Sequence, residues 1–294
     1  DRIGGRLKSL RNTKTPTDAL LFPVIPEDSS APLSTADFAV ELGAENFMGL
    51  DSPWGKIITT LRLNTIDLTT TDHKYVLDKI AKSATDWQGD PDFTAVKNFA
   101  DNLKTLSAST QTAQQAASAV GQRGHALLNS MVGNFYGSNN ERLGVGGVAQ
   151  NLERITHDTK LYVLKNNPVQ DVLISRFSNI VPGVQLNKPV ESISHSPEKV
   201  TLTFEDGSQM EANKVIITTP LSVLKNGSIA FSPALPGSKV SAMDKLGMDP
   251  SLRVILDFKK NLWGDNTGFI WGGTTAPQYF NGGAGRSEFY RTLS

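Results

Sequence analysis

The first residues of the chain combine glycine and arginine in a way that suits contact with a phosphate group. They read Asp1-Arg2-Ile3-Gly4-Gly5-Arg6. Glycine has no Cβ, so a ligand can approach the backbone N–H groups of Gly4 and Gly5 closely. Arg6 could add a planar, permanently charged donor to the same phosphate or to a nearby ribose. A Gly-Gly turn that only faces solvent could have the same residues. These six residues alone therefore leave open whether the turn binds a phosphate.

Other catalytic patterns are missing from the sequence. The four histidines, His73, His125, His157 and His195, have no metal-ligand spacing, and there is no cysteine. The sequence contains no G-x-S-x-G turn, no H-E-x-x-H and no phosphate-binding P-loop. We therefore expect no metal site and find no support for a hydrolase or a phosphotransferase. A chain without cysteine is compatible with any redox compartment.

Length and charge narrow the classes of protein further. The 294 residues exceed the usual size of one domain, so two domains are expected, with one large domain as the alternative. Lys plus Arg and Asp plus Glu both number 29, so we expect no nucleic-acid partner. No apolar run reaches the roughly 18 to 20 residues that span a bilayer, and no signal segment opens the sequence. We expect a soluble chain, and the sequence leaves its compartment and oligomeric state unknown.

The second half of the chain is rich in strand signals. Residues 184–204 contain runs that alternate apolar and polar side chains, and Asp206-Gly207 marks a hairpin turn after them. Residues 214–220 form a continuous apolar run, which predicts a buried strand of a parallel sheet. Residues 252–258 predict a further strand, and residues 238–246 predict a helix between the two.

The middle of the chain has few helix breakers. Between Lys74 and Val132, apolar residues recur at helical spacing, which predicts three or four helices. Asp92, directly before Phe93, suits the N-cap of one helix, and residues 107–119 have the composition of another. Strand signals on both sides of this helical insert predict two discontinuous domains.

Three segments together resemble the flavin-containing amine oxidases, the family that includes polyamine, monoamine and L-amino-acid oxidases. The first segment is residues 1–6, and the second is residues 41–49, Glu-Leu-Gly-Ala-Glu-Asn-Phe-Met-Gly. The third runs from Val190 to Trp263 and includes Val-Ile-Ile-Thr-Thr-Pro at residues 215–220. A generic strand and turn does not explain so many similar residues in the same order, so this third match indicates the family.

The resemblance implies a fold and a division into domains. We expect a mixed α/β (α+β) fold with a Rossmann-like FAD-binding domain, incomplete in this sequence, and a helix-rich substrate domain with a mixed sheet. Residues 1–60 and 181–236 would form the FAD-binding domain, and residues 61–180 and 237–294 the substrate-binding domain. The family's G-x-G-x-x-G turn and its C-terminal flavin segment are not in this sequence. We therefore expect the isolated segment to be poorly stable and to bind FAD weakly or not at all.

The resemblance also assigns residues to the cofactor. The paired glycines would approach the FAD pyrophosphate, the second segment would pass the flavin ring, and the third would contact the adenine and close on the dinucleotide. The residues assigned to FAD in this way are Arg2, Gly4, Gly5, Arg6, Gly43, Ala44, Glu45, Val190, Thr219 and Pro220.

Arg253 is the candidate catalytic residue, because it occupies the position of a family lysine. In the family that lysine holds a water against flavin N5 and helps reoxidation by oxygen. Arginine keeps its charge and cannot act as a tunable base, whereas a buried lysine can lose its proton. We expect either a related variant of the chemistry or an impaired reaction with oxygen.

The activity that the resemblance implies is FAD-dependent oxidation of a polyamine, a monoamine or an L-amino acid. The partners would be a small-molecule amine and oxygen, and the products an imine and hydrogen peroxide. Two alternatives remain. One is another FAD oxidoreductase of the same fold, such as a carotenoid desaturase or a protoporphyrinogen oxidase. The other is a catalytically silent relative that only binds. The sequence does not identify the amine.

Overall fold

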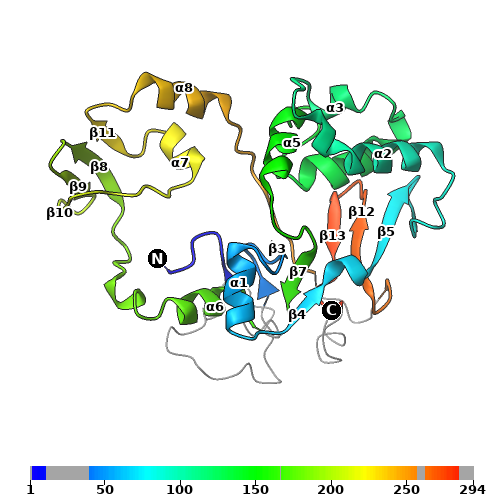
Figure 1. The fold of residues 1–294 in the computed structure, drawn as a ribbon, viewed down its shortest axis with the longest axis horizontal. Coiled ribbons are helices and arrows are strands. Elements are labelled where there is room, and N and C mark those ends of the chain that lie inside the picture. The colour runs from blue at the N-terminus through cyan, green and yellow to red at the C-terminus, as the bar shows by residue number, and fades with distance from the viewer. Residues whose placement is uncertain (1, 11–39, 166, 257–261, 285–294) are drawn as a thin grey trace. The chain divides into compact units, whose positions relative to one another are not determined.

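The computed structural model describes residues 2–10, 40–165, 167–256 and 262–284 and divides the chain into two compact units (Figure 1). The first unit consists of Asp1–Ile3 and Ile180–Pro250, and the second of Gly4–Asn179 and Ser251–Ser294. Both units contain helices and strands, which confirms the predicted mixed α/β class. The functional division that pairs residues 1–60 with residues 181–236 stays a prediction.

A four-stranded sheet organises the first unit. Its strands are β8 (Val190–His195), β9 (Val200–Phe204), β10 (Gln209–Ala212) and β11 (Ala230–Ser232), in the order β10-β9-β8-β11. The predicted hairpin after β9 is confirmed, and Gly207 in its turn has a φ of +78°, which glycine adopts without strain. β11 runs parallel to β8, with Phe231 opposite Ile193.

Short helices complete the first unit. They are the 3-10 helix η6 (Val181–Gly183), α7 (Leu221–Lys225) and α8 (Gly237–Lys245). α8 confirms the helix predicted over residues 238–246. Residues 184–186 form no strand, because the chain leaves η6 in a largely exposed loop that pairs with no strand in the described part of this unit.

The buried strand predicted at residues 214–220 is wrong. The segment forms no strand, and Ile216 and Ile217 are 89% and 40% exposed. A parallel strand becomes buried only where neighbouring strands and the helices on both faces of the sheet cover it. Among the residues that the structure describes, no strand pairs with this segment, so its apolar sequence alone does not produce a ladder.

Three sheets lie in the described part of the second unit. β1 (Ser9–Leu10) and β2 (Val40–Glu41) form an antiparallel pair. β3 (Phe47–Met48), β7 (Leu161–Leu164) and β4 (Thr65–Asp67) form a sheet in the order β3-β7-β4. The third sheet has the order β13 (Gln278–Phe280), β12 (Thr267–Trp271), β5 (Asp72–Leu77) and β6 (Ile80–Lys82). Since β12 runs parallel to β5 and the other pairs are antiparallel, this sheet is mixed, as predicted.

The second unit is also rich in helices. They are α1 (Pro53–Thr60), η2 (Leu68–Thr70), α2 (Pro91–Asp101), η3 (Leu103–Leu106), α3 (Ala113–Ala116), η4 (Gln122–Gly124), α4 (His125–Leu128), the π-helix η5 (Asn129–Asn134), α5 (Val145–Arg154) and α6 (Val169–Arg176). In Figure 1, α2, α3 and α5 gather over one end of the β5–β12 sheet. Within the described ranges, no helix is long and apolar enough to cross a membrane.

The helical prediction for residues 74–132 is correct from Pro91 onward and wrong before it. Val76 and Ile80 lie in the β5–β6 hairpin, whose turn residues Asp78 and Lys79 have φ values of +51° and +64°. β5 also pairs with β12, which lies far away in the sequence. The local spacing of apolar residues cannot reveal such a partner strand. The helix predicted from that spacing is therefore wrong for this segment.

Two smaller helix predictions also need correction. The N-cap of α2 is Asp90, whose carboxylate accepts from the backbone N–H groups of Asp92 and Phe93, so Asp92 lies inside the first turn. The helix predicted over residues 107–119 shrinks to the four residues of α3. Its N-cap is Thr112, which forms a capping box with Gln115 in the first turn.

The strand predicted at residues 252–258 is absent where the structure describes it. Residues 251–256 form no strand, and Leu252 and Val254 are 89% and 66% exposed. No described strand pairs with them in a ladder. The part of the prediction at residues 257–258 lies outside the described residues.

Three apolar clusters lie in the described part of the second unit, and two of them pack helices against the sheets. The larger packs β5 against α2, α4 and α5, with Leu77, Val96, Leu127 and Val145 at most 1% exposed. Each such side chain contributes on the order of 1.5–3 kcal/mol by leaving water. The smaller core joins β3, β7, α1 and α6. It fixes β3, the strand that directly follows residues 43–45 of the predicted site.

His73 is a partly buried titratable group in the β5–β12 sheet. Its ring lies 5.7 Å from that of Phe269 on β12, measured between centroids. Its Nδ1 is buried and has no hydrogen-bond partner in the structure. Burial lowers the pKa of His73 below the usual 6.5, while Asp72 and the Leu68 carbonyl oppose the shift. The folded protein therefore favours the neutral imidazole.

This shift predicts a loss of stability in acid. Because the unfolded chain binds a proton at His73 more readily than the folded chain, the stability present above pH 6.5 is lost as the pH falls through the lower folded pKa. We expect His73→Gln to flatten the fall in unfolding free energy measured with urea between about pH 7.5 and pH 5. The same substitution at the exposed His195 is the control and should leave the slope unchanged. An equally steep slope in His73→Gln would contradict the assignment.

Candidate functional site

The two glycine-containing segments of the predicted site lie side by side in the second unit. β1 follows residues 4–6, and β2 precedes residues 43–45, so the pairing of these strands brings the segments together. The contact continues beyond the strands. The Gly43 backbone N–H donates to the Lys8 carbonyl at 3.1 Å, and that of Ala44 donates to the Arg6 carbonyl at 3.0 Å. Six of the residues assigned to FAD therefore share one place: Gly4, Gly5, Arg6, Gly43, Ala44 and Glu45.

The first of these segments is a tight turn that needs glycine. Gly4 and Gly5 have φ values of +119° and +54°, which residues with a side chain rarely adopt. The Leu7 backbone N–H donates to the Gly4 carbonyl at 2.9 Å and closes the turn. A Cβ added to Gly5 would meet no atom within 4 Å, and Gly5 and Arg6 are both exposed. The turn therefore leaves open space against its backbone, beside a guanidinium group.

Gly43 serves a different purpose, which is close packing of the two segments. A Cβ at this position would lie 2.2 Å from the Arg6 carbonyl oxygen and 2.6 Å from the Lys8 backbone nitrogen. Both obstacles are backbone atoms, so a side chain at residue 43 would push the segments apart. The absence of a side chain at Gly43 thus permits the contact that forms the site.

A buried polar network anchors the paired strands. Glu41 is 6% exposed, and its two carboxylate oxygens accept from the Ser9 hydroxyl at 2.6 Å and from the Val169 backbone N–H at 2.9 Å. The side-chain oxygen of Gln170 accepts from the Ser9 backbone N–H at 3.1 Å. The backbone N–H of Gln170 donates to the Ser9 hydroxyl at 3.2 Å. Val169 and Gln170 open α6, where the helix dipole favours a negative charge. The network fixes β1 and β2 on the start of this helix.

Arg253 adds a third segment to the site. Its Nη1 donates to the Glu41 carbonyl oxygen at 2.6 Å and to the Glu45 carboxylate at 3.0 Å. The Glu45 side chain is 9% exposed and the Arg253 side chain 40%. Two residues that the sequence named for separate reasons therefore form one ion pair.

The remaining predicted residues lie in the first unit. Arg2 donates from its guanidinium to the neighbouring Ile3 carbonyl. Val190 begins β8, opposite Phe204 on β9. Thr219 is exposed, and Pro220 directly precedes α7. The assignment of these residues to FAD stays a prediction.

Ser9 and Gln170 are site residues that the sequence did not reveal. Neither belongs to a recognisable pattern, and 161 positions separate them in the chain. Glu41 offered the one available signal. It stands in an apolar, strand-like run, and a carboxylate buried there requires hydrogen-bond donors. That signal indicates the need for partners but not which residues supply them.

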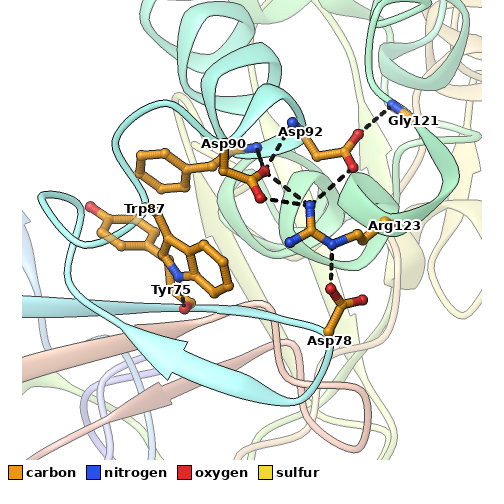
Figure 2. A network of polar contacts seen from close by, with 8 residues as sticks. Tyr75, Asp78, Trp87, Asp90, Asp92, Gly121 and Arg123 are labelled. Atoms are coloured by element: carbon orange, nitrogen blue, oxygen red, sulfur yellow. Dashed lines mark hydrogen bonds and ion pairs between the residues drawn. The ribbon is translucent and has the colours of Figure 1, made fainter.

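A second polar cluster surrounds Arg123 (Figure 2). Its guanidinium donates to Asp78 from Nε and pairs through Nη1 with Asp90 at 2.8 Å and Asp92 at 3.3 Å. Hydrogen bonds to Asp78 and Asp90 raise the pKa of Arg123. A hydrogen bond from the Phe93 backbone N–H and the contact with Arg123 lower the pKa of Asp90. The arginine thus neutralises an otherwise repulsive group of carboxylates.

Trp87 lies beneath the same cluster. The indole N–H donates to the Tyr75 carbonyl at 2.7 Å, and Arg123 stands 5.6 Å from the centroid of the indole ring (Figure 2). Lys82 lies 4.6 Å from the same centroid. Such cation–π contacts stabilise packed aromatic rings. The cluster ties the β5–β6 hairpin to α2 and η4, so its role is structural. No group of three or more His, Cys, Asp and Glu side chains in the described ranges could hold a metal ion.

Proteins with similar sequences include histone demethylases and polyamine oxidases. A family model described as flavin containing amine oxidoreductase matches residues 102–291, more than half of the chain. Lysine-specific histone demethylase 2 from Homo sapiens is 36% identical over 96 residues, which cover 33% of this chain and 12% of the relative. Polyamine oxidase 1 from Zea mays is 37% identical over 87 residues, 30% of this chain and 17% of the relative.

Solved structures share the fold. A double mutant of putrescine oxidase matches 95% of this chain and 64% of its own, with a TM-score of 0.66 and 13% identity. Cyclohexylamine oxidase from Brevibacterium oxydans matches 83% of this chain and 56% of its own, with a TM-score of 0.58 and 20% identity. The chain therefore spans less than two thirds of these structures and a much smaller share of the two curated relatives.

The family model covers enough of the chain to show its family. The chain belongs to the family of flavin-containing amine oxidoreductases, which confirms the predicted family. FAD, the predicted cofactor, is the cofactor of this family.

The second unit offers features that suit a dinucleotide. The open space over Gly5 would let a phosphate approach the backbone, and the exposed Arg6 adds a positive charge beside it. The neighbouring segment 43–45 is held rigidly by backbone hydrogen bonds and by Arg253. These residues fit the group that the family binds.

Gly43 provides a test of the close contact between the segments. We expect Gly43→Ala to lower the free energy of unfolding by about 1–3 kcal/mol, because its methyl group would collide with the backbone of Arg6 and Lys8. Urea unfolding of the full-length protein measures the change. Gly147→Ala is the matched control, since residue 147 lies in α5 with no atom within 4 Å of the added methyl, and it should stabilise by about 0.5–1 kcal/mol. Wild-type stability in Gly43→Ala would rule out the close contact.

The Arg123 cluster predicts a salt-dependent stability. Arg123→Gln leaves Asp78, Asp90 and Asp92 without their shared cation, so the variant should have a lower Tm than the wild type. The difference should shrink in high salt, because ions screen exposed charges. Differential scanning fluorimetry at two salt concentrations measures both effects. Lys97→Gln is the control. It removes only the exposed Lys97–Asp101 pair and should change the Tm much less.

Proposed function

We propose that the full-length protein oxidises an aliphatic amine with FAD, passing a hydride from the carbon beside nitrogen to flavin N5. Oxygen accepts the two electrons, so one amine and one oxygen give one imine and one hydrogen peroxide. When bound, FAD supplies the redox chemistry. The match of residues 102–291 to the flavin-containing amine oxidoreductases is the observation that carries the proposal.

The names of the relatives support an amine as the substrate class. They include polyamine oxidases, a histone lysine demethylase, putrescine oxidase and cyclohexylamine oxidase. Each name contains an amine or an amine-bearing side chain as the group acted on. A polyamine, a monoamine and an L-amino acid therefore remain the candidate substrates, and a methylated lysine side chain joins them through the demethylase.

The chain itself would supply binding and positioning. The Gly4-Gly5 turn and Arg6 would hold the pyrophosphate, while residues 43–45 would pass the flavin ring. Val190, Thr219, Pro220 and Arg2, which lie in the first unit, are proposed as further FAD-binding residues. Residues 1–60 and 181–236 would then form the FAD-binding domain, and residues 61–180 and 237–294 the substrate-binding domain. The rigid support of residues 43–45 suits this role, because a flavin must meet its substrate in a fixed orientation.

The test is a two-stage assay of the FAD-loaded, full-length protein. Each amine of a panel is first mixed with the protein without oxygen, and loss of the visible flavin absorbance reports hydride transfer. Peroxide is then measured after oxygen is admitted. The panel contains spermine, spermidine, putrescine, a primary monoamine, L-amino acids and a dimethyl-lysine peptide. We expect at least one amine to bleach the flavin and to yield peroxide in equal amount.

Two outcomes would change the proposal. Bleaching without peroxide would show that oxygen is not the acceptor, in line with the arginine at position 253. No bleaching by any amine, with FAD bound, would overturn the proposal. It would favour either another FAD oxidoreductase of this fold or a catalytically silent relative.

A further inference from the structure

Arg253 connects two segments that are far apart in the sequence. It belongs to the exposed stretch of residues 251–256, which pairs with no strand in the described part of the second unit. Its Nη1 nevertheless reaches the Glu41 carbonyl at 2.6 Å and the Glu45 carboxylate at 3.0 Å. The separations in sequence are 212 and 208 positions. The guanidinium thus contacts Glu41 in β2 and Glu45 in the loop that leads to β3.

The burial of the two partners shows which of them depends on the other. The Glu45 side chain is 9% exposed, whereas that of Arg253 is 40% exposed. A buried carboxylate without a cation or donors is strongly unfavourable, while an exposed guanidinium is solvated by water. Removing Arg253 would therefore take a cation partner from Glu45 and from the segment that carries it. Removing Glu45 would release Arg253 from the same segment.

We infer that Arg253 and Glu45 form a charge clamp that fixes residues 43–45 against residues 6–8, and that Arg253 acts as a positioning residue and not as a proton acceptor. The inference rests on the proposed function in one respect, which is that residues 43–45 face the flavin. The chemistry of arginine agrees with this role. Its guanidinium stays protonated, and its planar array of donors can serve a carbonyl and a carboxylate together.

The clamp acts on a contact that can be measured directly. The Gly43 and Ala44 backbone N–H groups donate to the Lys8 and Arg6 carbonyls. If the clamp holds this segment, its loss lets these amides open more often and exchange faster with solvent. Amide exchange does not require turnover, so it reports the clamp independently of catalysis.

The experiment compares Arg253→Gln, Glu45→Gln and the double variant in the full-length protein without and with FAD. Each single variant should accelerate exchange at Gly43 and Ala44 about tenfold, and the double variant should add little beyond Arg253→Gln, because both changes break the same ion pair. Each should also weaken FAD binding and shift the visible spectrum of the bound flavin. Arg253→Lys keeps a cation and should retain part of the protection.

Matched controls come from exposed residues of α5. Glu153→Gln and Arg154→Gln make the same chemical changes away from the site and should alter neither exchange nor FAD binding. Unchanged exchange in Arg253→Gln, or fully additive effects in the double variant, would overturn the clamp. Faster exchange with unaltered FAD affinity and spectrum would keep the clamp but overturn its orientation toward flavin. Amine oxidation is not needed for any of these outcomes, so a failed clamp is distinguishable from a failed activity.

Discussion

The buried carboxylate of Glu41 is the constraint on which the site depends. A charge that is 6% exposed requires donors from the protein, and here they come from Ser9 and from the start of α6. Satisfying this one group places β1, β2 and α6 together. The pairing of β1 with β2 then brings the two glycine-containing segments beside these strands into contact. The backbone carbonyl of the same residue also accepts from Arg253, so Glu41 connects the third segment as well.

The glycines of the site illustrate two separate physical requirements. At Gly4 and Gly5 the requirement is a backbone conformation with positive φ, and open space remains above Gly5. At Gly43 the requirement is steric, because backbone atoms of the neighbouring segment occupy the place of a side chain. The first kind of glycine suits a surface that receives a ligand. The second suits the packing that makes this surface rigid.

Family membership shows the class of protein, while the structure shows what surrounds Arg253, the residue expected at the position of a family lysine. Its guanidinium pairs with the carboxylate of Glu45 and so contacts the loop that carries this residue. Residues 214–220 and 252–256 make a related point. Their sequences suit strands, yet they are exposed where no described strand pairs with them.

The sequence by itself determined the family, the mixed class of fold, the strands β8 to β10 with their hairpin, and α8. These features depend on residue order and on local alternation or helical spacing, which a sequence displays directly. It also indicated the helices after Pro91, although with the wrong N-cap and too long a helix at residues 107–119. Only the tertiary structure decided that residues 72–82 form a hairpin, that Ser9 and Gln170 hold Glu41, and that Arg253 pairs with Glu45. Each of these depends on a partner that is distant in the chain, and local pattern carries no information about such a partner.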